Sequence, residues 1–197
     1  MFRKLLNPII NKARPAAYHP FGPDFGLTVY PEFLRDNEVK VIQQQYVDIY
    51  LRKGKLSQMS DGRMQLPPLN PASFAEPLDR IYQEKIVHPG YLNNQTVNLY
   101  QPGGFIRAHV DNLFIYDGSF VVFSIGAPGL LKFVHLQNGE ELECVIPDQS
   151  IYVLEGPARH IYLHMVPPVE AQRFSLVLRR SIMRTTGTFH DVEPQMK

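Results

Sequence analysis

The chain has 197 residues, of which 44% are hydrophobic and 20% are charged, and its formal net charge at pH 7 is +1. This composition suits one folded domain and excludes a chain that is disordered throughout. The single cysteine, Cys144, excludes an internal disulfide and a cysteine-based zinc site, and no run of residues is apolar enough to cross a bilayer.

The first 17 residues, MFRKLLNPIINKARPAA, carry four basic side chains and no acidic one. Apolar residues recur between these charges at helical spacing, which is typical of a mitochondrial targeting segment, although an ordinary basic arm is the alternative. The remaining chain holds 16 basic and 19 acidic residues, a net charge of −3. Proteins that bind nucleic acid through its phosphates normally carry a basic surplus, so direct contact with nucleic acid is disfavoured.

Residues 18–94 are expected to form a helical buttress. The run LTVY predicts a short strand at 27–30, and an apolar stripe at helical spacing predicts a helix over 31–53. Glycine and three prolines indicate a loop over 54–72, and a second apolar stripe predicts a helix over 73–87. Neither helix carries a pattern of catalytic residues.

The pattern changes at residue 95, where short apolar runs begin to alternate with glycine- and proline-rich turns. Strands at this regular spacing, with no helices between them, are typical of an antiparallel sandwich or barrel. We therefore predict an α+β fold, a double-stranded β-helix (jelly-roll) over 95–184 flanked by the N-terminal helices, with 185–197 as a C-terminal tail. The expected strands cover residues 96–100, 119–125, 130–136, 142–146, 150–155, 160–166 and 173–181.

Two histidines and an aspartate on the expected strands have the composition of a metal site. His109 and Asp111 are two residues apart, so in a strand both side chains point to one face. His164, in the run HIYLHMV, would complete a set of two histidines and one carboxylate, which leaves three positions open on Fe(II). His160, four residues earlier on the same expected face, is an alternative third ligand. A hydrogen-bonded histidine at a strand end is the purely structural alternative for either one.

Two arginines and two polar residues form a second set. Arg173 and Arg179 are six residues apart in one expected strand, which places both guanidinium groups on one face. Buried charges must be paired, so an inward-facing pair requires anions. An outward-facing pair on an edge strand is the alternative. Asn98 and Tyr100 also share a face, on the strand before the turn that leads to His109.

Together these motifs resemble the AlkB-like family of Fe(II)- and 2-oxoglutarate-dependent dioxygenases. The matching stretches, in chain order, are N-x-Y-x-P-G at 98–103, H-x-D at 109–111, G-x-A-R followed by H at 156–164, and R-x5-R at 173–179. The resemblance covers about residues 25–182, and within the family the chain is most similar to the small mitochondrial branch. It implies bound Fe(II), with 2-oxoglutarate as the co-substrate.

The resemblance also implies a role for each site residue. His109, Asp111 and His164 would be the catalytic iron ligands, and His164 is preferred to His160 because it stands five residues after Arg159, as in the family pattern.

The second set would bind the co-substrate. Arg173 would pair with the distal carboxylate of 2-oxoglutarate with help from Tyr100, since a planar guanidinium can bind a carboxylate with two hydrogen bonds. Asn98 and Arg179 would face the metal end of the co-substrate or the substrate.

Three functions follow from this resemblance. The preferred one is a mitochondrial matrix oxygenase that hydroxylates a protein or small-molecule substrate. The second is an accessory or structural subunit of a large mitochondrial complex, such as a ribosome, an ATP synthase or a respiratory complex, with little or no catalysis. The third, a nucleic-acid demethylase, is disfavoured because the main part of the chain is slightly acidic and only 54–72 and 88–94 are available as a lid over a flipped base.

Overall fold

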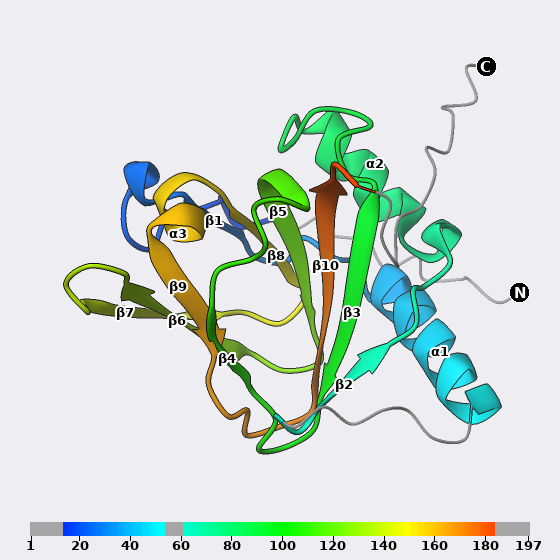
Figure 1. Ribbon diagram of the computed structural model, residues 1–197. Coiled ribbons are helices and arrows are strands. Elements are labelled where there is room, and N and C mark those ends of the chain that lie inside the picture. The colour runs from blue at the N-terminus through cyan, green and yellow to red at the C-terminus, as the bar shows by residue number, and fades with distance from the viewer. Residues whose placement is uncertain (1–13, 54–60, 184–197) are drawn as a thin grey trace, which may run out of the picture.

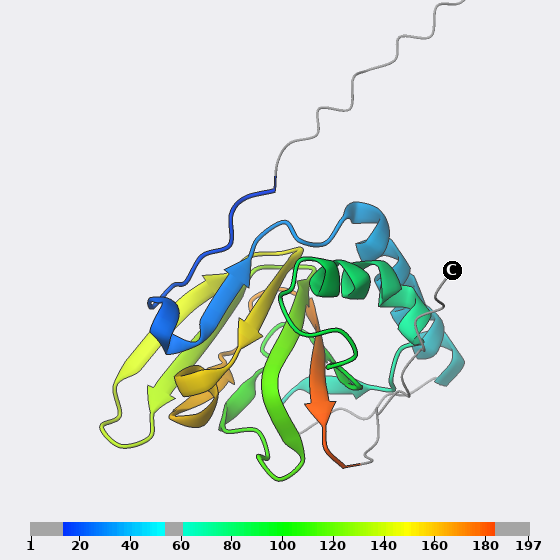
Figure 2. The same cartoon turned by 90° about the horizontal axis from the view of Figure 1, so that it is seen from above.

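Two antiparallel sheets face each other inside the molecule, and two helices cover the outer face of the larger sheet (Figures 1 and 2). The computed structural model describes residues 14–53 and 61–183. Most of the proposed targeting segment (1–17) and all of the tail (185–197) therefore lie outside the described residues. No helix in the described ranges has the length and apolar character needed to cross a membrane.

The larger sheet has six strands and the smaller sheet has four, and every pair of neighbouring strands is antiparallel. This arrangement confirms the predicted jelly-roll. The larger sheet has the order β1 (Leu27–Tyr30), β8 (Ser150–Leu154), β5 (Tyr116–Ile125), β10 (Arg173–Ser181), β3 (Asn94–Tyr100), β2 (Arg63–Leu66). The smaller sheet has the order β4 (Ile106–His109), β9 (Tyr162–Val166), β6 (Gly129–His135), β7 (Glu141–Ile146).

Helices α1 (Asp36–Lys53) and α2 (Ala75–Gln83) pack on the outer face of the larger sheet, while the short α3 (Gly156–His160) precedes β9. Two short 3-10 helices, η1 (Pro23–Phe25) and η2 (Pro71–Phe74), complete the described elements.

Strict alternation along the central strands separates two hydrophobic clusters. On β10, Phe174 and Leu176 are buried against the helices, while Ser175 and Val177 face the space between the sheets. The same alternation on β3 directs Val97 towards the helices. One face of each strand therefore builds the core under the helices, and the opposite face lines an interior cavity.

Both helices are shorter than predicted. Helix α1 begins at Asp36 because the chain turns after β1, where Glu32 has a positive φ of 50°, and because the Glu38 carboxylate accepts a hydrogen bond from the Arg35 N–H. Helix α2 ends at Gln83, and Lys85 then adopts a positive φ of 56°, which a continuing helix does not allow.

The prediction of a loop over 54–72 is wrong for its second half, which contains β2 and the start of η2. Strand β2 pairs with β3 and buries Leu66 in the helix-side cluster. Four residues with two polar side chains carry too weak an alternation to stand out in a proline-rich stretch.

Candidate metal centre

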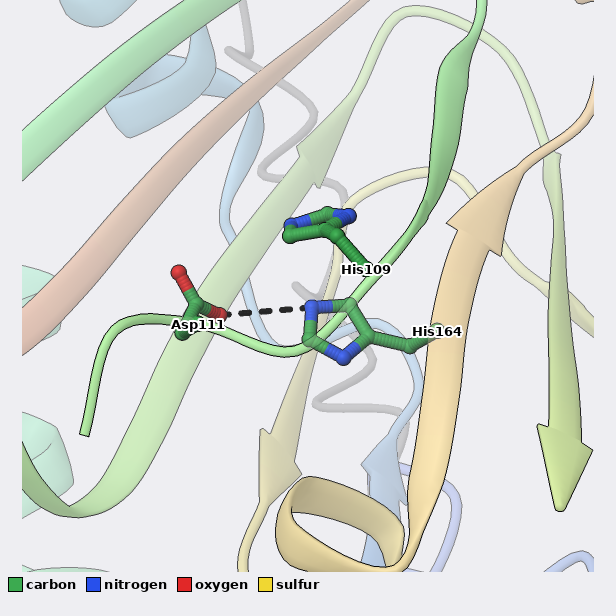
Figure 3. A group of neighbouring side chains, drawn as sticks. All are labelled: His109, Asp111 and His164. Carbon is green, nitrogen blue, oxygen red and sulfur yellow. Dashed lines mark ion pairs between the residues drawn. The ribbon is translucent and has the colours of Figure 1, made fainter. Parts of the chain in front are cut away.

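His109, Asp111 and His164 meet between the two sheets, with one possible ligand atom of each within 4.8 Å of the others (Figure 3). The pairing of β4 with β9 places His109 directly opposite His164, and their ring centroids are 4.4 Å apart. The Nε2 atom of His164 lies 3.3 Å from Oδ2 of Asp111. Residues 55 positions apart in the chain thus come within reach of one cation.

Two details differ from the sequence prediction. Strand β4 ends at His109, so Asp111 lies in the irregular segment that follows the strand, yet its carboxylate still points to the two histidines. The expectation that His160 shares a face with His164 is wrong, because residues 156–160 form α3 and leave His160 exposed. The proline after Gly156 favours the first turn of a helix, which is the signal that would have separated the two histidines.

His109 and Asp111 have surroundings that favour the protonation states a metal needs. Nδ1 of His109 lies 2.8 Å from the Arg107 carbonyl oxygen, which can only accept, so Nδ1 carries the proton and Nε2 keeps its lone pair. Burial, together with the nearby His164, lowers the pKa of His109. Burial alone would raise the pKa of Asp111, but its hydrogen bond to His164 and the positive charge of Arg179 lower it. A neutral imidazole and an ionised carboxylate suit a divalent transition metal such as Fe(II).

Arg179 fixes the orientation of Asp111. Its Nη1 atom donates a 3.0 Å hydrogen bond to Oδ1 of Asp111, its Nη2 atom donates to Thr96, and its guanidinium carbon lies 3.9 Å from the centre of the Tyr116 ring. With Oδ1 held in this way, Oδ2 is the oxygen directed to His164. Arg179 therefore contacts the oxygen of Asp111 that is not directed to His164, and its predicted role at the metal end of the co-substrate or the substrate stays a prediction.

Arg173 lies at the other end of β10 and is 3% exposed. Nη2 donates a 2.8 Å hydrogen bond to Ser124, and the guanidinium carbon lies 5.7 Å from the centre of the Tyr100 ring. Its Nε atom has no hydrogen-bond partner, and Arg173 makes no ion pair within residues 14–53 and 61–183. A buried guanidinium without an anion is costly, so this environment fits a carboxylate supplied by a ligand such as 2-oxoglutarate.

A cavity of about 280 Å³ contains the three candidate ligands. The lining side chains fall into two chemical groups: we call the apolar ones, which come from both sheets, the apolar wall, and the polar ones, which come from β2, β3 and β10, the polar wall. The apolar wall is lined by Ile106, Phe120, Val122, Leu131, Leu154 and Val166. The polar wall is lined by Arg63, Gln65, Thr96, Asn98, Tyr100, Ser175 and Arg179.

Asn98 and Tyr100 both lie on this polar wall, which agrees with the prediction that they share one face of their strand. The hydroxyl groups of Tyr100 and Ser175 are 3.4 Å apart, and the Asn98 amide donates to the same serine oxygen at 3.4 Å. The Asn98 carbonyl oxygen accepts a 3.1 Å hydrogen bond from Arg63, a residue that the sequence analysis did not identify. Gln65, Thr96 and Ser124 were also missed, because no motif marks them and only the three-dimensional pairing brings them to the site.

The comparisons with known proteins agree with this geometry. A family profile described as the 2OG-Fe(II) oxygenase superfamily matches residues 57–188. The chain is 28% identical over 129 residues to tRNA (carboxymethyluridine(34)-5-O)-methyltransferase ALKBH8 of Mus musculus, a match that covers 55% of this chain and 19% of that protein. It is 33% identical over 67 residues to alpha-ketoglutarate-dependent dioxygenase alkB homolog 7, mitochondrial, of Bos taurus, covering 34% of this chain and 30% of that protein.

These relatives are matched over less than a third of their own length. Among solved structures, OsALKBH1 superimposes with a TM-score of 0.59 at 16% sequence identity, covering 79% of this chain and 96% of that chain. At this identity the likeness concerns the fold alone.

Proposed function

The chain belongs to the 2OG-Fe(II) oxygenase superfamily, and from this premise we propose that it is an active oxygenase of the AlkB group that hydroxylates a protein or small-molecule substrate in mitochondria. The observation that supports catalysis most directly is the meeting of His109, Asp111 and His164 in a cavity whose neighbouring Arg173 is buried without an anion.

In this proposal His109, Asp111 and His164 would hold Fe(II), and Arg173, with Tyr100 beside it, would bind the distal carboxylate of 2-oxoglutarate. When bound, this pair supplies the oxidising power for hydroxylation, with O2 as the oxidant and 2-oxoglutarate converted to succinate and CO2. Asn98 would lie beside the co-substrate or the substrate on the polar wall.

The other residues of the site would prepare it for this chemistry. The Arg107 carbonyl keeps the proton of His109 on Nδ1, and Arg179 holds one oxygen of Asp111 so that the other is available. The apolar side chains that include Phe120 and Leu131 would supply contacts for the apolar part of a substrate. These contacts place the reacting groups before any substrate arrives.

The mitochondrial location is supported by two observations. The basic, acid-free pattern of residues 1–17 is typical of a targeting segment. The partial match to a relative whose name includes "mitochondrial" agrees with it.

The experiment is anaerobic reconstitution of the full chain with Fe(II) and 2-oxoglutarate, followed by measurement of succinate after O2 is admitted. We expect slow succinate formation without a prime substrate, and its loss in His109→Ala. His160→Ala is the matched control, because this exposed histidine lies outside the cavity. If the wild-type chain took up no metal, the proposal would be wrong.

A second candidate, a subunit of a large mitochondrial assembly, is favoured by an exposed apolar surface. Leu113 and Phe114 are 48% and 85% exposed, and Ile182 and Met183 are 56% and 57% exposed. The Ile182 N–H donates to the Ile115 carbonyl, so the two segments lie together. Surfaces of this kind often contact partners. Sedimentation of a mitochondrial lysate tests this role, which predicts migration well above the size of the free chain.

A further inference from the structure

We infer that the outer strand β2 forms the substrate-selecting face of the cavity, and that Arg63 and Gln65 there bind a neutral amide group of a polypeptide substrate. This inference rests on the proposed oxygenase function and adds to it the chemical class of the substrate.

The position of β2 gives its side chains access to the cavity. It is the outermost strand of the larger sheet and pairs with β3, with Arg63 opposite Tyr100 and Gln65 opposite Asn98. Leu66 is buried towards the helices, whereas Arg63 and Gln65 line the cavity that contains the metal-ligand cluster. The strand therefore places two polar, hydrogen-bonding side chains side by side on one wall.

Arg63 is held in a fixed orientation with part of its guanidinium unused. Nε donates to Oδ2 of Asp61 at 2.9 Å, and Nη1 donates to Oδ1 of Asn98 at 3.1 Å. Asn98 in turn donates to Ser175 at 3.4 Å. Within the described ranges 14–53 and 61–183, neither Nη2 of Arg63 nor the side chain of Gln65, which is exposed at the cavity, makes a hydrogen bond, so both are accessible to a ligand.

The turn before β2 supports this orientation. Gly62 has a φ of 76° and packs against the backbone of Gly104, where a Cβ would come within 3.3 Å of the Gly104 Cα. The Phe105 N–H donates to the Asp61 carbonyl. The backbone of Asp61 is therefore held by Phe105, and its carboxylate is held by Arg63. These contacts fix the position of the ion pair at the edge of the cavity.

The charges select a neutral group. Arg63 is already paired with Asp61, so a substrate carboxylate at Nη2 would also be repelled by Asp61. An amide carbonyl can accept from Nη2 without this repulsion, and the Gln65 amide can both donate and accept, which matches an amide N–H and C=O.

The same charges favour a polypeptide over a nucleic acid. Arg179 is paired with Asp111, and Arg173 is buried, so neither is available to a phosphate backbone. Beyond the first 17 residues the chain carries more acidic than basic residues.

The test uses Mn(II), which replaces Fe(II) without turnover and accelerates the NMR relaxation of protons bound near it. The full chain is loaded with Mn(II) and 2-oxoglutarate, and N-methylacetamide serves as the probe of the peptide group, with tert-butanol as a non-binding reference. We expect faster relaxation of the N-methylacetamide methyl protons with the wild-type chain, and loss of this effect in Arg63→Met and Gln65→Leu.

Arg63→Lys keeps the charge beside Asp61 but loses the planar donor, so it should also lose the faster relaxation. Arg180→Met and Gln137→Leu are controls that should retain it, because both residues lie outside the cavity.

Each alternative outcome is distinct. If 2-oxoglutarate protons were not relaxed by Mn(II), the proposed function itself would fail. If they were relaxed but N-methylacetamide were unaffected, or were equally affected in Arg63→Met and Gln65→Leu, only the inference about β2 would be overturned. Preferential relaxation of acetate would refute a neutral ligand, and preferential relaxation of adenosine monophosphate would refute a polypeptide.

Discussion

Arg173 and Arg179 are arginines on the same strand, yet each has different neighbours and therefore a different expected role. They stand six residues apart on β10, and each meets a different partner. Arg179 contacts the carboxylate of Asp111, while Arg173 contacts the hydroxyl of Ser124 and has no acidic partner among the described residues. The motif R-x5-R predicts their shared face, but only the packing shows which neighbour each one meets.

At this scale, the first prediction concerns the orientation of Asp111. In Arg179→Met the carboxylate loses a 3.0 Å hydrogen bond and is free to rotate, so we expect Mn(II) affinity to fall by about 10- to 100-fold. Calorimetric titration measures this, with the exposed neighbour in Arg180→Met as the control. An unchanged or higher Mn(II) affinity would contradict this prediction. It would mean that the repulsion between Arg179 and the divalent ion equals or exceeds the benefit of orienting Asp111.

A second prediction concerns the space around Arg173. A Cβ on Gly129 would lie 1.6 Å from Nη1 of Arg173, so Gly129→Ala must displace the guanidinium group. We expect 2-oxoglutarate affinity to fall about tenfold, or about 1.4 kcal/mol, with Mn(II) affinity unchanged.

Calorimetry of Gly129→Ala, Arg173→Ala and the double variant tests this route. Because both changes act through one side chain, the double variant should bind 2-oxoglutarate no more weakly than Arg173→Ala alone. Additive losses would show that Gly129 acts through another contact.

At the scale of the elements, local patterns predict the strands well and the ends of helices poorly. Strands β5, β8 and β10 are visible in the sequence because each is a short apolar run between turn residues, and most of their side chains are buried. The start of α1 depends instead on the turn at Glu32, and β2 depends on its pairing with β3, so neither can be derived from its own residues. Sequence and structure therefore differ mainly where a contact with a distant segment decides the outcome.

One such contact joins the two helices. Glu38 at the start of α1 accepts two hydrogen bonds from Arg80 of α2, at 2.6 and 2.8 Å, and Arg80 also donates to the Phe33 carbonyl. Burial would raise the pKa of Glu38, but the Arg80 hydrogen bonds and positive charge lower it. We expect Glu38→Gln to reduce the free energy of unfolding at pH 7 by about 2 kcal/mol.

The pH dependence gives the sign of this effect. Because the pKa of Glu38 is lower in the folded protein than in the unfolded chain, its contribution is present above the ordinary value of 4.5 and is lost as the pH falls through the folded value. Urea unfolding of wild type and Glu38→Gln should differ at pH 7 and converge in acid. The exposed Glu76→Gln should match wild type at both pH values. A difference that persists in acid would mean that the variant acts through packing rather than charge.

At the scale of the whole molecule, the sequence predicts the jelly-roll, the candidate ligands and the polar residues of β3 and β10, because each is carried by a short motif. It does not predict the composition of the cavity. Arg63 and Thr96 reach the site through strand pairings across the larger sheet, and their partners Asn98 and Arg179 lie 35 and 83 residues away. No pattern within a single segment contains that information.

The overall charge leads to the last prediction. Beyond the first 17 residues the chain has 16 basic and 19 acidic residues, and Arg63, Arg80 and Arg179 are each paired with a carboxylate, so there is no basic surplus for phosphates. We expect weak binding of single-stranded RNA or DNA, with little change in affinity across a salt series. A variant with Arg3, Lys4 and Lys12 changed to Gln separates any contribution of the first residues. A steep salt dependence that survives in this variant would restore the nucleic-acid demethylase hypothesis.

The facing position of His109 and His164 on one rung of the β4–β9 ladder has a consequence for how the protein matures. Since side chains alternate along a strand, a slip of one residue in either strand would turn one imidazole away from the other. A chain in which β4 and β9 are misaligned therefore cannot bind the metal ion with both histidines, even if the rest of the domain has folded. Uptake of the ion would thus report that these two strands have reached their final alignment, and incompletely folded molecules would carry no reactive centre.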